Sequence, residues 1–250
     1  MRVLPNTSAR AVKRLCRKFG LDLRRYSPVN DEFLRLTHYL QLYKVSLVLD
    51  VGANVGQFAQ GLRAAGFAGR IISFEPLRQA HAVLACKADA RWIVAPRAAI
   101  GDRRAQVEIN VSGNSYSSSL LPILERHIGA APSSAYVATE TVTMMPLDEA
   151  AREFIEPRDV VFVKIDVQGL EAQVLTGAEA TLEKTAGLEL ELSLLPLYEG
   201  SASWECLVAK ILAQGFQWWD VKCGFRDPRD YRLLQLDGIF FRDRVLNSSN

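Results

Sequence analysis

The sequence predicts an α/β fold in which strands and helices alternate around a mostly parallel sheet. Two apolar runs rich in β-branched residues, 47–51 and 160–165, are typical of strands buried on both faces. Segments with apolar residues at helical spacing separate such runs along the chain. With 250 residues, 49% of them hydrophobic, the chain can bury one sizeable core. We expect one such domain, preceded by N-terminal helices.

A basic amphipathic helix is predicted near the N-terminus, over about 8–19. Val12, Leu15 and Phe19 recur at helical spacing, and arginine or lysine occupies most positions between them. Such a helix suits an anionic membrane surface, but it equally suits a helix that packs on the domain with its charges in water. The pattern leaves both possibilities open.

A second helix is expected over 31–43, packed against the edge of the sheet. The two helices form an N-terminal extension, 1–45, ahead of an α/β domain at 46–245. In this domain we expect strands at 47–51, 70–75, 91–95, 106–111, 139–144, 160–165, 187–192, 216–221 and 234–241. We expect helices at 55–65, 77–88, 120–128, 148–154, 171–183 and 204–214, and a flexible loop at 130–134.

The junction after the first strand predicts a nucleotide-type pocket. Gly52 permits a tight turn and lets the backbone come close to a ligand, and the next helix points its free N–H groups at the same place. The spacing from Gly52 to Gly56, with Asp50 just before it, lacks the third glycine of a dinucleotide fingerprint. It also lacks the Lys-Ser/Thr pair of a phosphate-binding loop.

An acid, Glu75, ends the second strand before Pro76, where it can accept hydrogen bonds from ribose hydroxyls. This order of acid, glycines and second acid resembles the S-adenosylmethionine (SAM) site of class I methyltransferases. In that fold Ala99 and Ile100 would form an apolar wall for adenine, with Asp102 as a polar contact. An ordinary βα turn with a surface glutamate, and a Gly-Asp hairpin turn, are the simpler alternatives.

A hydroxyl-rich segment, 112–119, interrupts the alternation. Long polar excursions in a compact domain are usually functional or mobile. If this one covers the pocket, its hydroxyls could bind a polyhydroxylated acceptor and His127 could reach the reacting groups. A lone loop histidine is more often a surface residue.

Lys164 and Asp166 are two residues apart and therefore point to the same face of the sheet. Lys164 can pair with Asp166 and with Glu191 of the next strand, and such coupled charges shift one another's pKa. The alternative is an ion-pair network that only braces the sheet. We favour a function, because ionisable groups buried at the ligand edge of a sheet need a reason.

The composition of the chain further limits the kinds of partner, structural site and cellular compartment that we expect. A net charge of +2 gives no reason to expect a nucleic-acid partner. The four cysteines are scattered without a Cys-x-x-Cys pair, which favours a reducing compartment over a disulfide framework or a zinc site. The chain has neither a membrane-spanning apolar run nor a signal-peptide pattern. We expect a cytoplasmic protein, either free or peripheral at the inner membrane surface.

Together the motifs resemble the FkbM family of SAM-dependent methyltransferases. The match covers about 47–241 and rests on 50–56, 74–76, 147–148, 174–178, 191–200 and above all 164–171, Lys-Ile-Asp-Val-Gln-Gly-Leu-Glu. One departure is Gln168, where many relatives have glutamate; because both occur, it puts little in doubt.

The resemblance implies a Rossmann-like class I fold with a seven-stranded, mostly parallel sheet and helices on both faces. It implies SAM as cofactor and O-methylation of a hydroxyl. The residues it places at the cofactor are Asp50, Gly52, Ala53, Asn54, Gly56, Phe58, Glu75, Pro76, Ala99, Ile100 and Asp102. The residues expected at the chemistry are Asp166, Lys164, Glu191 and His127.

Because SAM carries an activated methyl group, the protein has to supply alignment and a base for the hydroxyl proton. Asp166 is our first choice as that base. Some O-methyltransferases use a divalent ion, but no compact ligand cluster is visible in the sequence, and we expect no metal site.

The sequence suggests four functions, two of which it disfavours. The preferred acceptor is a sugar hydroxyl of a glycolipid or cell-surface glycan, because the basic N-terminal helix suits a lipid-anchored substrate. The second possibility is a small secondary metabolite such as a polyketide. A non-catalytic SAM- or glycan-binding partner is disfavoured by the intact motifs. A nicotinamide or nucleotide-sugar oxidoreductase is disfavoured by the missing third glycine.

Overall fold

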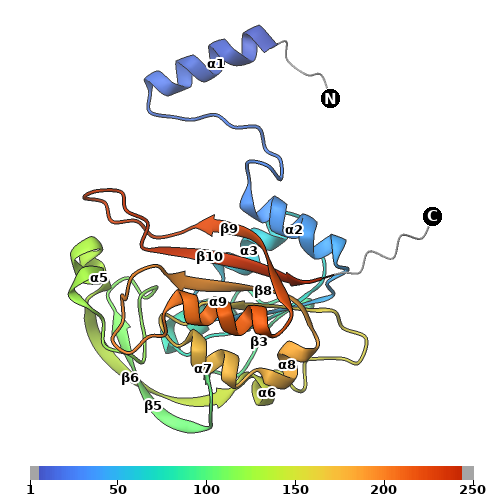
Figure 1. Cartoon of the computed structure of the whole chain (residues 1–250), viewed down its shortest axis with the longest axis vertical. Helices are drawn as coiled ribbons and strands as arrows, with labels where there is room; N and C mark the ends of the chain where they lie inside the picture. Colours follow the sequence, from blue (N-terminus) through green and yellow to red (C-terminus); the bar gives the residue numbers. More distant parts are fainter. Residues whose placement is uncertain (1–5, 244–250) are drawn as a thin grey trace.

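The centre of the structure is a seven-stranded sheet with helices on both faces (Figure 1). The computed structural model describes residues 6–243. The strand order is β3-β2-β1-β7-β8-β10-β9. The first five strands in this order are parallel to one another, and β10 is antiparallel to both of its neighbours, β8 and β9. The strands are β1 (Leu47–Val51), β2 (Arg70–Phe74), β3 (Trp92–Val94), β7 (Val161–Ile165), β8 (Thr185–Ser193), β9 (Phe216–Cys223) and β10 (Gln235–Arg242). The predicted seven-stranded, mostly parallel sheet is confirmed.

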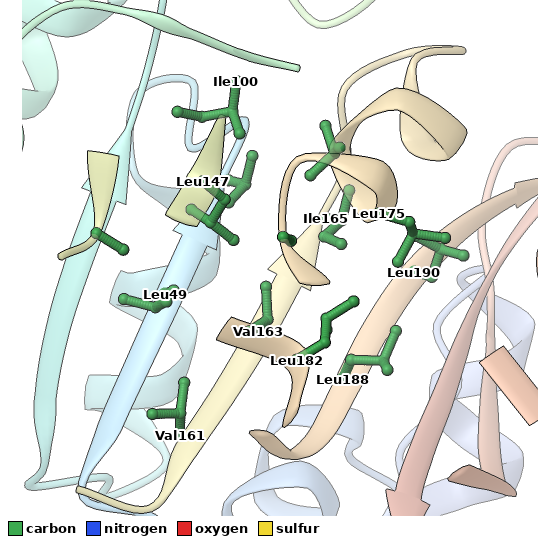
Figure 2. Packing of buried hydrophobic residues seen from close by; sticks show 14 of the residues in the cluster. Leu49, Ile100, Leu147, Val161, Val163, Ile165, Leu175, Leu182, Leu188 and Leu190 are labelled. Atoms are coloured by element: carbon green, nitrogen blue, oxygen red, sulfur yellow. The ribbon is translucent and has the colours of Figure 1, made fainter. Parts of the chain in front are cut away.

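One face of the sheet is covered by four short helices. Figure 2 shows this layer, in which Leu49, Val163 and Leu188 of the strands meet Leu175 and Leu182 of the helices. The helices are α6 (Leu147–Ala150), α7 (Glu171–Thr176), α8 (Glu179–Glu183) and α9 (Trp204–Ala213). All five side chains are fully or almost fully buried, so this layer forms the larger part of the core.

The opposite face is covered by α2 (Glu32–Leu42), α3 (Gln57–Ala64) and α4 (Arg78–Ala85). Asp31 caps α2 by accepting a hydrogen bond from the Leu34 N–H at 2.9 Å. Leu36 and Leu40 then pack with Val48 and other side chains of the sheet. The expectation that this helix packs at the edge of the sheet is therefore wrong, since these strand side chains belong to its face.

The N-terminal helix α1 (Asn6–Lys18) stands apart from the sheet and its helices (Figure 1). Val12, Leu15 and Phe19 are 45%, 58% and 75% exposed, so the predicted apolar stripe does not pack on the domain. Across residues 6–243, no helix combines the length and hydrophobicity that a membrane crossing requires. The division at residue 45 stays a prediction.

A second sheet, of order β4-β6-β5, lies beside the first. Its strands are β4 (Ala99–Gly101), β5 (Ala105–Ser112) and β6 (Tyr136–Pro146). The sequence predicts β5 and β6 but not β4, because three residues are too few to carry a periodic signal.

Several other elements differ from the prediction. The expected helix at 148–154 is only α6, which ends at Ala150. The expected helix at 120–128 is replaced by α5 (Glu125–Ala130), after an extended stretch in which Ile123 bridges to Tyr198. The expected loop at 130–134 contains a 3-10 turn. The expected helix at 171–183 breaks at Gly177, where a Cβ would lie 2.0 Å from the Gly101 carbonyl oxygen of β4.

Candidate functional site

A cavity of about 470 Å³ opens at the carboxyl ends of β1, β2, β7 and β8, a size typical of small-molecule sites. Twelve of the expected site residues line it, namely Gly52, Ala53, Asn54, Phe58, Glu75, Pro76, Ala99, Ile100, His127, Lys164, Asp166 and Glu191. Asp50, Gly56 and Asp102 do not line it.

The glycine turn is shaped by the neighbouring strand. Gly52 has φ +79°, and a Cβ there would lie 1.8 Å from the carbonyl oxygen of Asp166. The N–H groups of Gly52 and Ala53 both donate to the Phe74 carbonyl oxygen, at 3.1 and 3.0 Å. The contact that excludes a side chain at Gly52 is therefore with the chain itself, rather than with a ligand as expected.

Glu75 is held at the end of β2 by two backbone hydrogen bonds. The Asn54 N–H donates to Oε2 at 2.7 Å and the Leu77 N–H donates to Oε1 at 2.8 Å. Burial raises the pKa of Glu75 to about 7, although both hydrogen bonds oppose this shift. Each carboxylate oxygen keeps further acceptor capacity, so the group can still bind hydroxyls in the cavity.

Asp50 lies beneath the cavity instead of lining it. It is fully buried in the register between Ser73 of β2 and Lys164 of β7. Its Oδ2 accepts a hydrogen bond from Ser73 Oγ at 3.1 Å, and its Oδ1 lies 3.6 Å from Lys164 Nζ. Burial raises the pKa of Asp50 above its ordinary value. The residue braces the floor of the cavity.

The other two residues that do not line the cavity have local roles. Gly56, at φ +90°, is the N-cap of α3, where a Cβ would lie 2.8 Å from the Trp92 ring. Asp102 forms an ion pair with Arg103 at 3.0 Å.

Lys164 connects the glycine turn to the end of β7. Its Nζ donates to the Gly52 carbonyl oxygen at 3.1 Å and lies 3.2 Å from Asp166 Oδ2. Burial opposes its charge, but Asp166 and Asp50 outweigh burial and raise the pKa of Lys164. The side chain is therefore a fixed cation and cannot act as a base.

Gln168 joins two of the expected residues and was missed as a site residue. Its Nε2 donates to Asp166 Oδ1 and to Glu191 Oε2, both at 2.8 Å. Its Oε1 accepts a hydrogen bond from the Tyr198 hydroxyl at 2.7 Å. Burial, followed by the charges of Asp166 and Glu171, raises the pKa of Glu191 well above its ordinary value.

A second lysine, Lys222, adds to the charged cluster that lines the cavity. Its Nζ lies 2.5 Å from Glu189 Oε1 and 3.4 Å from Asp237 Oδ2. It also lies over the rings of Phe33 and Phe58, 5.5 and 5.7 Å from their centroids. Two acidic residues in the sequence could have indicated this part of the cluster: Glu189, two residues before Glu191, and Asp237 in the last strand.

Within the segment 112–119, residues 114–119 form one wall of the cavity. Ser119 Oγ donates to the Gln168 carbonyl oxygen at 2.6 Å, and Ser115 Oγ accepts from Asn54 Nδ2 at 3.3 Å. Through these hydrogen bonds, the wall is attached to the glycine turn and to the loop that follows β7.

His127 is part of the same wall and is buried rather than on the surface. Its Nε2 lies 3.4 Å from Ser117 Oγ, and its ring lies between those of Tyr198 and Phe225. Burial lowers the pKa of His127 to about 4, so the ring is neutral near pH 7.

Comparison with protein families matches residues 50–218 to the family described as the methyltransferase FkbM domain. No curated protein matches the chain. Among solved structures, it is similar to an O-methyltransferase from Bacillus cereus in complex with SAH (10% identity, TM-score 0.47, covering 96% of this chain and 93% of that chain). It is also similar to the plantazolicin methyltransferase BamL in complex with a triazolic desmethylPZN analog and SAH (10% identity, TM-score 0.46, 95% and 91%).

Proposed function

This chain belongs to the FkbM methyltransferase family, and from that premise we propose that it methylates a hydroxyl oxygen of a sugar, in a glycolipid or a cell-surface glycan. SAM is the cofactor of this family. The observation that carries the proposal is the single cavity that joins a buried, backbone-held carboxylate, Glu75, to a cluster of carboxylates and lysines at the ends of β7 to β10.

The residues at one end of the cavity fit SAM. The carboxylate of Glu75 keeps acceptor capacity for the ribose hydroxyls, and Ala99 and Ile100 offer an apolar surface for adenine. Asp166 contributes negative charge near the glycine turn, which suits a sulfonium cation. When bound, the cofactor supplies an activated methyl group.

Other residues of the cavity lining fit a sugar. Asn114, Gln235 and Asp237 offer acceptors and donors, while Tyr116 and Phe225 offer aromatic faces. Sugar hydroxyls and ring C–H groups match such a mixture of polar groups and aromatic rings. A small secondary metabolite with a hydroxyl group is the second candidate, because the same lining would accept it.

The chain supplies orientation and electrostatics to the transfer. Lys164 fixes Asp166 against the glycine turn, and Gln168 fixes Asp166 relative to Glu191. A carboxylate of the cluster then accepts the hydroxyl proton.

The exposed stripe of α1 supports a lipid-linked acceptor. Val12, Leu15 and Phe19 are exposed beside a run of arginines and lysines over 10–25. An exposed apolar stripe flanked by basic side chains fits the surface of an anionic membrane. We therefore propose peripheral contact with such a surface through residues 8–25.

Titration calorimetry with S-adenosylhomocysteine (SAH) tests the cofactor end. We expect about micromolar binding by the wild type. Because Glu75 would lose its hydrogen bonds to the ribose, Glu75→Ala should bind at least about tenfold more weakly. Asp102→Ala is the matched control and should bind as the wild type. Equal binding by Glu75→Ala would contradict the ribose contact.

Transfer of a labelled methyl group from SAM into a lipid extract tests the acceptor. Label in the glycolipid fraction supports the sugar proposal. Label only in small water-soluble products would favour the second candidate. Binding of SAH without transfer to either fraction would favour a partner protein.

A further inference from the structure

Asp237 differs from the other carboxylates that line the cavity because, within the described residues, no donor forms a hydrogen bond to its side chain. Asp166 is held by Gln168 and Lys164, Glu191 by Gln168, and Glu189 by Lys222. Within residues 6–243, Asp237 accepts no side-chain hydrogen bond and has only Lys222 Nζ as an ion-pair partner, at 3.4 Å. Its side chain is 27% exposed and lines the cavity.

The charges that face Asp237 come from β8 and β9, which flank β10, and from β7 on the other side of β8. Glu189 and Glu191 lie on β8, Lys222 lies on β9, and Lys164 and Asp166 lie on β7 and at its end. With Glu75, five carboxylates therefore share the cavity with two lysines, and the carboxylate of Glu32 of α2 further offsets the charge of Lys222. This excess of negative charge favours either a bound proton or a cation.

Burial raises the pKa of Asp237 to about 7, and the charge of Glu189 adds to this effect while Lys222 opposes it. A carboxyl group with this pKa exchanges a proton readily near neutral pH, as a catalytic base must. Both oxygens of Asp166 are already engaged, Oδ1 by Gln168 and Oδ2 by Lys164.

We propose that Asp237 is the catalytic base: it releases a proton when the cationic cofactor enters the cavity, and it accepts the proton of the acceptor hydroxyl during methyl transfer. In the transfer, the acceptor oxygen bonds to the methyl carbon as the carbon–sulfur bond breaks, and the electron pair of that bond stays on sulfur. The hydroxyl proton passes to the Asp237 carboxylate. This assignment rests on the proposed O-methyl transfer.

The same assignment gives the cavity a constant charge. Entry of the cation coincides with loss of a proton, and loss of the positive charge from sulfur coincides with return of a proton. The product SAH is neutral at sulfur, so its binding does not displace the proton of Asp237. The affinities for SAM and SAH should therefore respond differently to pH.

The test is the ratio of the SAM and SAH affinities, measured by calorimetry as a function of pH. Any proton linked to Glu75 affects both ligands and cancels in the ratio. In the wild type, preference for SAM should fall by up to about tenfold for each pH unit below about pH 7. Asp237→Asn should abolish this slope while it retains SAH binding. Asp102→Asn, the matched control, should retain the slope.

Other outcomes would overturn the proposal. An unchanged slope in Asp237→Asn would do so, and a slope lost only in Glu191→Gln would assign the proton to Glu191. If Asp237→Asn fails to fold, the wild type still decides the matter through its binding heats in two buffers of different ionisation enthalpy. Equal proton release for SAM and SAH would contradict the proposal. A wild type that binds neither ligand would overturn the proposed function, and this inference with it.

Discussion

Gly52 shows how one position couples two strands. Its φ is positive, and the space that a Cβ would need is already filled by the backbone of Asp166. Both features are properties of the fold, so they act before any ligand is bound. Substitution here should therefore affect stability as well as binding.

We expect Gly52→Ala to lower the free energy of unfolding by about 3–5 kcal/mol, because the Cβ would overlap a carbonyl oxygen that cannot move freely. Chemical denaturation measures this change. Gly66→Ala is the matched control: Gly66 has φ +92°, but no atom lies within 4 Å of its Cβ position. That variant should cost only about 1 kcal/mol, the strain of a positive φ. Similar costs for both variants would show that the crowding at Gly52 is harmless.

Individual site residues were predictable where a local motif carries them. Gly52 and Glu75 follow apolar strands directly, and their position at the ends of parallel strands places them at one edge of the sheet. Lys222 and Asp237 were missed because they meet only through the register of β9 and β10. A shift of one residue would turn both side chains to the other face, and the sequence does not specify that register.

At the scale of elements, α1 is the helix whose apolar residues contribute to no core cluster within residues 6–243. Its only described ion pair is between Arg17 and Asp22, beyond the end of the helix. An exposed apolar side chain gains free energy only when another surface covers it. The basic residues around the stripe select an anionic surface.

We expect the wild type to co-sediment with vesicles that contain phosphatidylserine and to stay in solution with neutral vesicles. Leu15→Ser combined with Phe19→Ser should abolish the binding, because the apolar contact is lost while every charge remains. Val137→Ser on β6, which is 70% exposed, is the matched control and should bind as the wild type. If the double variant co-sedimented with these vesicles as the wild type does, the contact would depend on charge alone.

Elements with a clear local sequence pattern were predicted well, and short or crowded ones were not. The strands β1 and β7 were predicted within one residue because both are buried apolar runs. The break at Gly177 was missed, because its cause is the backbone of β4, far away in the sequence. Tertiary crowding of this kind leaves no local pattern.

At the scale of the whole molecule, buried carboxyl groups in and near the cavity affect global stability. Burial raises the pKa of Glu75, Glu171 and Asp237 to about 7. An acid whose pKa is higher in the folded state contributes stability that is complete below its unfolded pKa, near 4.5 for Glu and 3.8 for Asp. That contribution is lost as the pH rises through about 7.

The protein without cofactor should therefore become less stable between about pH 5 and pH 8. In Glu75→Gln, this decrease should be smaller by up to about 3 kcal/mol, because one titrating group is removed. Denaturant unfolding at several pH values measures the slope. The dependence of the unfolding free energy on pH is compared, rather than its value at one pH, because the glutamine amide also loses a backbone hydrogen bond. Identical slopes in both proteins would show that Glu75 titrates normally.

The contact between Gly52 and Asp166 has a consequence for inheritance and for engineering. The segment 50–56 and the segment 164–171 lie far apart in the sequence, yet the Lys164 ammonium binds the Gly52 carbonyl oxygen and the two backbones leave no space for a methyl group between them. A change in one segment alters the fit of the other. We expect the sequences of the two segments to covary among relatives. A chimera that exchanges only one segment should be destabilised, whereas a chimera that exchanges both should fold.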